Sequence, residues 1–260
     1  MKEQIYSLDI LILAGGDPIE LAEGSPPIHR SLMEIHGKKV LEHMIDAVRQ
    51  SGVCNQLIVI GSEMVTASNI PSLVDSYIEV KASSKLSENF RKGTSKSNAS
   101  HILILGGDIP TLHADILTQL NELVHEHKEK DLLAFVVLDE AVEQSFPGSE
   151  RTYGKIKEGR AKVGNSILVR KDALPRLDPL IDKFTKNRKS VIKLAFSFGI
   201  LNIIRLAIFK NISIPQLEIA FKKSTHLDVR GIIVPFGELA VDIDKASDIA
   251  DIENYFRRNA

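Results

Sequence analysis

Apolar runs alternate with segments of helical periodicity along the first two thirds of the chain. Short apolar runs bounded by turn residues are typical of buried strands. Apolar residues spaced three or four apart predict helices at Lys39–Gln50 and Ala114–His125. Strands that alternate with helices predict an α/β fold, with a three-layer, Rossmann-like, mixed and mostly parallel sheet covered on both faces. The expected strands are Leu8–Leu13, Gln56–Gly61, Ser76–Val80, His101–Leu105, Leu132–Leu138 and Ser166–Arg170.

The pattern changes between about residues 175 and 230, which predicts a helical insertion within a single domain spanning residues 1–260. A helix is expected after Ser213, where Ser-Ile-Pro-Gln supplies an N-cap, an early proline and a glutamine three positions on. Beyond the insertion, strand character returns at 230–236 and 239–244.

The most apolar part of this insertion is Val191–Phe209, which is apolar on nearly every face. Its uncharged stretch, between Lys193 and Arg205, has eleven residues. A membrane-spanning helix needs about 20 apolar residues. The segment is therefore expected to be core, a homodimer contact or a peripheral membrane contact.

The charge balance excludes a general attraction to nucleic acid. Lys and Arg total 33 against 34 Asp and Glu, so selectivity must come from a local site. The single cysteine, Cys54, excludes an internal disulfide and fits a reducing compartment. The first residues are too charged and their apolar core too short for a signal peptide, so a cytoplasmic protein is expected.

Two segments, 8–17 and 101–110, run from a buried strand into two glycines and an aspartate. In open α/β sheets, ligands bind where the carboxyl ends of such strands meet. Gly15 and Gly16 could offer backbone amides to a phosphate, or could simply form a tight strand-to-helix turn. Asp108 could hold a divalent metal, or could only cap a helix at Ile109. Together the two segments predict a nucleotide site.

Further candidate side chains lie in the second half of the chain. Asp242 and Asp244 would share one face of a strand, as metal ligands for the same cleft or as loop caps. Tyr153 and Lys155 alternate in TYGKIK and could grip an acceptor phosphate, or form an ordinary solvated strand face.

The order of these motifs resembles the MobA-like nucleotidyltransferases. LILAGG is followed by LILGGDIP, by Gly164-Asn165 and by VDIDKASDIADI, over nearly the whole chain. The family includes enzymes that make sugar nucleotides and enzymes that load nucleotides onto cofactor precursors. The resemblance implies a nucleotide-diphospho-sugar transferase type of fold. It also implies Mg²⁺-dependent transfer of an NMP from an NTP to a small phosphorylated acceptor, with release of pyrophosphate.

The resemblance also implies roles for individual residues. Asp108 would bind Mg²⁺ together with Asp244 or Asp242, and Asn165 would lie near the acceptor. The residues implied in nucleotide binding are Ala14, Gly15 and Gly16, with the two glycines against the base and phosphates, and Ser87 and Asn89 for the base or ribose.

The sequence departs from the family pattern in the loop after the first strand. Family members usually have a further glycine and an arginine after the glycine pair, and a lysine about ten residues later. Here the early arginine is absent, and Arg30 occupies roughly the lysine position as the candidate phosphate-binding catalytic residue. A nucleotide-sugar-dependent glycosyltransferase is a second hypothesis, although only one acid stands at Asp108. The third is a non-catalytic nucleotide-binding protein of the same fold.

Overall fold

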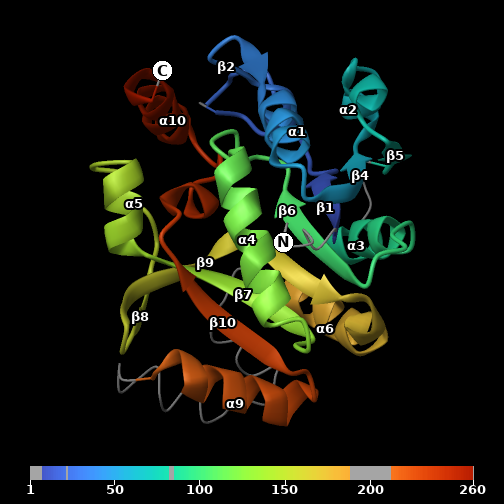
Figure 1. The fold of residues 1–260 in the computed structure, drawn as a ribbon. Helices are drawn as coiled ribbons and strands as arrows, with labels where there is room; N and C mark the ends of the chain where they lie inside the picture. The colour runs from blue at the N-terminus through green and yellow to red at the C-terminus, as the bar shows by residue number, and fades with distance from the viewer. Residues whose placement is uncertain (1–7, 22, 82–84, 188–211, 260) are drawn as a thin grey trace, which may run out of the picture.

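A mixed sheet forms the centre of the molecule (Figure 1). The computed structural model of the chain describes residues 8–21, 23–81, 85–187 and 212–259. The strand order is β10-β7-β9-β6-β1-β4-β5, and β8 pairs with β9. β9 is antiparallel to β6, β7 and β8, whereas the other pairs are parallel. The strands are β1 (Leu8–Ala14), β4 (Cys54–Gly61), β5 (Ser76–Glu79), β6 (His101–Gly106), β7 (Leu132–Leu138), β8 (Gly154–Ile156), β9 (Gly159–Arg170) and β10 (Val229–Val234), and β2 (Glu34–Ile35) and β3 (Lys38–Lys39) form a separate small sheet.

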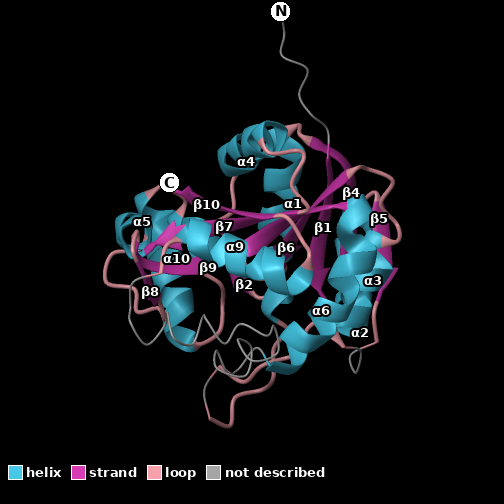
Figure 2. Ribbon diagram, turned by 90° about the horizontal axis from the view of Figure 1, so that it is seen from below, coloured by secondary structure: helices cyan, strands magenta, loops and turns pink. Residues whose placement is uncertain are grey.

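Helices cover both faces of the sheet, with α1 and α4 on one side and α3 and α6 on the other (Figure 2). Alternation along β1 divides the core, because Ile10 and Ile12 pack toward α1 and α4 while Leu11 packs with Phe90 of α3. The predicted three-layer α/β fold is confirmed. The helices are α1 (Val40–Ser51), α2 (Glu63–Thr66), α3 (Leu86–Thr94), α4 (Ala114–Glu126), α5 (Asp139–Ser145), α6 (Leu174–Asn187), α9 (Ile214–Thr225) and α10 (Ala246–Arg258), with 3₁₀ turns η1 (Arg30–Leu32), η2 (Ile70–Leu73), η3 (Lys171–Ala173) and η4 (Gly237–Ala240).

The predicted strands and helices of the first two thirds are present. β9 is longer than expected and begins at Gly159. The predicted helix after Ser213 is α9, and Gln216 accepts a hydrogen bond from the Ser213 backbone N–H at 3.0 Å, which completes the capping box. Within the described ranges no helix is long and apolar enough to cross a membrane. The segment Val191–Phe209 lies outside the described residues.

The strand predicted at 239–244 is wrong. This segment is a 3₁₀ turn followed by irregular chain. Leu239, Val241 and Ile243 are all fully buried, which explains the strand-like alternation. The segment crosses the end of the sheet instead of pairing along it, and the Ile243 N–H donates to the Asp108 carbonyl at 3.3 Å.

The ends of β1 and β6 lie unusually close together. The Gly107 N–H donates to the Leu13 carbonyl at 3.0 Å. A Cβ atom on Gly107 would lie 2.8 Å from that carbonyl oxygen and 2.9 Å from the Ala14 Cα, so only glycine fits without moving the backbone. This contact places the Gly15–Gly16 loop and Asp108 side by side at the carboxyl edge of the sheet.

Candidate active site

An arginine bridges two of the predicted carboxylates at this edge. Arg30 lies in η1, and its Nη1 is 3.0 Å from Asp108 Oδ2 and 2.9 Å from Asp244 Oδ1. The same nitrogen donates to the Ile243 carbonyl at 3.2 Å. Arg30 therefore joins the loop after β6 to the loop before α10.

Asp242 and Asp244 do not share a strand face, because their segment is not a strand. The Asp244 side chain is 63% exposed and turns to Arg30, whereas the Asp242 side chain is 18% exposed and lies 3.7 Å from Lys162 Nζ. Neither caps α10, since the side chain of Asp248 accepts the backbone N–H groups of Asp244 and Lys245 at 2.7 and 2.8 Å. The two aspartates therefore do not serve as the cap of α10.

A buried ion pair anchors the loop that carries these two aspartates. Arg151 Nη1 lies 2.9 Å from Asp248 Oδ1, and the two side chains are 6% and 1% exposed. The Asp242 carbonyl accepts a hydrogen bond from Arg151 at 3.4 Å. On the other side Lys162 Nζ donates to the Ala240 carbonyl at 2.7 Å. Sequence reasoning missed Arg151 and Lys162, because no local pattern marks either residue.

The electrostatics of Asp108 reflect this crowding of acids. Its pKa is raised to about 7, chiefly by burial; Arg30 opposes the rise, and the charges of Asp242 and Asp244 add to it. The pKa of Asp244 is also raised, by partial desolvation and by Asp242. Three carboxylates therefore face two positive groups, Arg30 and Lys162, at this edge of the sheet.

The donor set suits a hard divalent cation. Asp108 and Asp244 each direct one carboxylate oxygen to a single point, now taken by Arg30 Nη1. In the part of the chain that the structure describes, no three acidic, histidine or cysteine side chains are arranged around one point. Mg²⁺ usually takes only one or two carboxylates and completes its shell with water and substrate phosphates. The residues present fit such an ion.

The glycine loop lies on the other side of Arg30. A Cβ atom on Gly16 would be 3.7 Å from Arg30 Nη2, and one on Gly15 would be 2.9 Å from Asn89 Nδ2. Backbone hydrogen bonds of 2.9 Å in both directions between Ile19 and Ile28 close the loop and return the chain to Arg30. Ser87 and Asn89 are both buried in α3.

The structure excludes the simpler interpretations of the two glycine-aspartate segments. The Gly15–Gly16 loop does not lead directly into a helix, since the next elements are η1 and the small β2–β3 sheet. Asp108 does not cap a helix, because α4 begins at Ala114 with His113 as its N-cap.

Asn165 lies beside the end of β6, on β9. The Cβ atom of Asn165 lies 3.8 Å from the position that a Cβ atom on Gly106 would take. The Asn165 Nδ2 is buried, and no hydrogen-bond acceptor for it is found within the described ranges. A buried donor without an acceptor is costly to the folded state.

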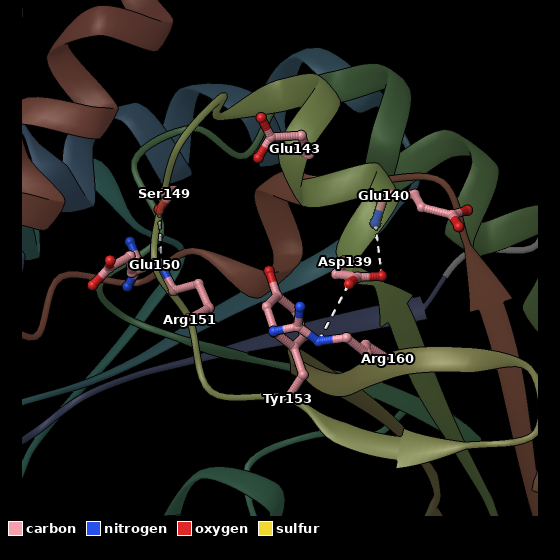
Figure 3. A pocket seen from close by; sticks show the side chains of 8 residues that line it. All are labelled: Asp139, Glu140, Glu143, Ser149, Glu150, Arg151, Tyr153 and Arg160. Carbon is pink, nitrogen blue, oxygen red and sulfur yellow. Dashed lines mark hydrogen bonds and ion pairs between the residues drawn. The ribbon is translucent and has the colours of Figure 1, made fainter.

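Tyr153 lies just before β8 and Lys155 within it, so only Lys155 belongs to the strand on which both were predicted. Tyr153 precedes β8 and lines a cavity of about 690 Å³, whereas Lys155 is exposed on β8 and does not line it. The Arg160 guanidinium lies 5.2 Å from the Tyr153 ring centroid and reaches Asp139 at 3.4 Å (Figure 3). The other residues lining the cavity are Glu140, Glu143, Ser149, Glu150 and Arg151.

The raised pKa of Asp108 predicts a pH-dependent stability. An aspartate ionises near its ordinary value of 3.8 in the unfolded chain but at about 7 here. The folded state thus binds this proton more tightly, and stability falls as the pH rises from about 4 to about 7. In chelator-treated buffer, Asp108→Asn should be more stable than wild type at pH 8 by on the order of 2–4 kcal/mol, and equally stable near pH 4. Urea unfolding at both pH values measures this, and a variant less stable at pH 8 would contradict it.

Comparisons with known proteins bear on the family and the fold of the chain. A family model described as the MobA-like NTP transferase domain matches residues 10–193. A hypothetical transferase from Thermus thermophilus is 23% identical, with a TM-score of 0.76 over 93% of this chain and 99% of that one. A CMP:2-keto-3-deoxy-manno-octonic acid synthetase solved with CTP is 13% identical, with a TM-score of 0.63 over 98% and 100%.

A third structure, a Mycobacterium tuberculosis protein in complex with manganese, is 15% identical, with a TM-score of 0.51 over 97% of each chain. A search of curated protein sequences found no match. At these identities the structural likenesses establish the fold, and the family match covers most of the chain.

Proposed function

The chain belongs to the MobA-like NTP transferase family, and from this premise we propose that it moves an NMP from an NTP to a phosphorylated sugar or cofactor precursor. The observation that carries the proposal is the bridge between Asp108 and Asp244 directly beside the Gly15–Gly16 loop. This arrangement puts a carboxylate pair and the glycine loop on either side of one arginine.

The reaction must bring two anions together. An oxygen of the acceptor phosphate attacks the α-phosphorus of the NTP, a new P–O bond forms, and the bond to the β-phosphate breaks, so that pyrophosphate leaves. At about 4 Å two unit charges repel by about 4 kcal/mol at an effective dielectric constant near 20. The site therefore needs positive charge and backbone donors at the phosphates.

Asp108 and Asp244 would hold a divalent cation, with Asp242 close enough to add to the negative field. When bound, such a cation offsets the charge of the phosphates and stabilises the leaving pyrophosphate. Asp108 must be ionised to act as a ligand, so its pKa of about 7 makes cation affinity rise with pH through neutrality. Mg²⁺ is the ion that we propose.

The glycine loop would bind the triphosphate through its backbone. Ala14 ends β1, and the N–H groups that follow at Gly15 and Gly16 can approach phosphate oxygens closely because neither residue has a side chain. Asn89 lies against Gly15 and would contact the base or ribose, together with Ser87, two residues nearer the start of α3.

The acceptor would lie on the β9 side of the edge. Asn165 Nδ2 supplies a buried donor next to β6. The cavity with Tyr153 and Arg160 lies further along, and its wall includes Arg151, which also contacts the loop that carries Asp242. Lys155 is exposed on β8 and would contact only a longer acceptor.

Pyrophosphate release tests the proposed activity. The four ribonucleoside triphosphates are each incubated with Mg²⁺ and a panel of sugar phosphates and phosphorylated alcohols. Release that requires one NTP and one acceptor supports nucleotidyl transfer. In a parallel assay, turnover of a nucleoside diphosphate sugar instead would favour a glycosyltransferase. If neither reaction is detected, the non-catalytic hypothesis is favoured.

Gly16→Val should weaken NTP binding by at least about tenfold, because a branched side chain would fill the space between the loop and Arg30. Calorimetric titration of the folded variant measures the change. Gly52→Ala, at the positive-φ C-cap of α1, is a control whose strain lies away from the loop. Unchanged NTP affinity in folded Gly16→Val would remove the glycine loop from the site.

A further inference from the structure

We propose that the Arg30 guanidinium and a divalent cation compete for the same oxygen atoms of Asp108 and Asp244, and that the triphosphate makes room for the cation by taking up Arg30. This inference rests on the proposed function. It makes Arg30 a positioning residue that couples cation binding to nucleotide binding.

The distances leave no room for both positive groups. Nη1 of Arg30 lies 3.0 Å from Asp108 Oδ2 and 2.9 Å from Asp244 Oδ1. Mg²⁺ binds carboxylate oxygens at about 2.1 Å. A cation bound to both oxygens would therefore overlap with Nη1, and two positive centres at that separation would repel each other.

A second partner for Arg30 lies within reach. Its Nη2 is 3.7 Å from the place of a Cβ atom on Gly16, so one edge of the guanidinium already borders the proposed phosphate cradle. A planar guanidinium binds phosphate oxygens through two parallel hydrogen bonds. Rotation of the side chain would transfer Arg30 from the carboxylates to the triphosphate.

The backbone beneath Arg30 is fixed, so the side chain is the part that moves. The Leu32 N–H donates to the His29 carbonyl at 2.8 Å and closes η1, and the paired Ile19 and Ile28 hold the chain just before it. The Arg30 side chain is 26% exposed, which leaves it space to turn.

Competition between Arg30 and the cation predicts an unusual response to loss of the Arg30 charge. Binding of the cation alone must displace Arg30 without giving it a new partner, so the wild-type protein should bind a cation weakly. Nucleotide supplies that partner, and by linkage each ligand strengthens the other. Removing the guanidinium should then tighten cation binding and weaken NTP binding.

The test is a titration with Mn²⁺ alone at pH 8, in which electron paramagnetic resonance measures the concentration of the free ion. Arg30→Gln should bind Mn²⁺ at least about fivefold more tightly than wild type, because the competing charge is gone. Arg230→Gln is the matched control, since Arg230 pairs with Glu218 at 3.4 Å on the far strand β10. This control should bind Mn²⁺ as the wild type does. Melting curves check folding, and Arg30→Met is the second neutral variant.

Equal or weaker Mn²⁺ binding by both folded neutral variants would overturn the competition. Titration with NTP separates this inference from the proposed function. If Arg30→Gln binds Mn²⁺ more tightly but no NTP binds to the wild type, the competition for the carboxylates stands, whereas the coupling to nucleotide and the proposed function both fail. If NTP binds with Mn²⁺ but the variants gain no Mn²⁺ affinity, the proposed function stands and the competition is wrong.

Discussion

Asp108→Asn should lower the rate of metal-dependent nucleotidyl transfer by about 100- to 1000-fold, the usual loss when one electrostatic stabiliser of a transition state is removed. The amide keeps the shape of the side chain but carries no charge for a cation. The fold should survive, because the charge of Asp108 is unfavourable where it lies and the backbone contact from Ile243 is retained. Pyrophosphate release at saturating NTP measures the loss.

Asp46→Asn is the control for this experiment. Asp46 forms an exposed ion pair with Lys38 at 2.6 Å, outside the candidate site, and its loss should leave the rate unchanged. A folded Asp108→Asn protein that turns over at the wild-type rate would show that this carboxylate is not part of the reaction.

Arg151→Met should destabilise the fold by about 3–5 kcal/mol, because it would leave the carboxylate of Asp248 buried without its charged partner. Asp248 is fully buried and also accepts the backbone N–H groups of Asp244 and Lys245. The loss would therefore loosen the loop that carries the candidate cation ligands. The free energy of urea unfolding measures the effect.

The double variant Arg151→Met/Asp248→Asn should regain part of that stability, since it removes the stranded charge as well. Arg230→Gln, which breaks an exposed pair, should cost at most about 1 kcal/mol. If Arg151→Met is as stable as Arg230→Gln, the buried pair does not anchor the loop.

The sequence predicted the parallel part of the fold well, because fully buried strands read as continuous apolar runs. The predicted bounds of β1 and β6 agree with the structure to within one residue. Gly15, Gly16 and Asp108 were chosen as candidates because they follow the ends of these two strands. The failure at 239–244 has a physical cause. Leu239, Val241 and Ile243 alternate as in a strand, but they pack beneath the sheet end without forming a ladder.

The contacts within the site could not be predicted in the same way. Arg30 and Asp244 are 214 positions apart, and only the closed fold makes them neighbours. Arg151 and Asp248 likewise pair across distant segments, so neither shows a local signal. Tyr153 and Lys155 alternate in the sequence, but only Lys155 lies in a strand, because β8 begins at Gly154.

The most direct test of the account is calorimetric titration of the wild-type protein and Asp108→Asn with each of the four ribonucleoside triphosphates, with and without Mg²⁺. We predict that at least one NTP binds to the wild type, and that omission of Mg²⁺ or loss of the Asp108 charge weakens this binding by at least about tenfold. Absence of NTP binding, or binding that neither Mg²⁺ nor Asp108→Asn changes, would contradict a nucleotide and cation site at this edge of the sheet.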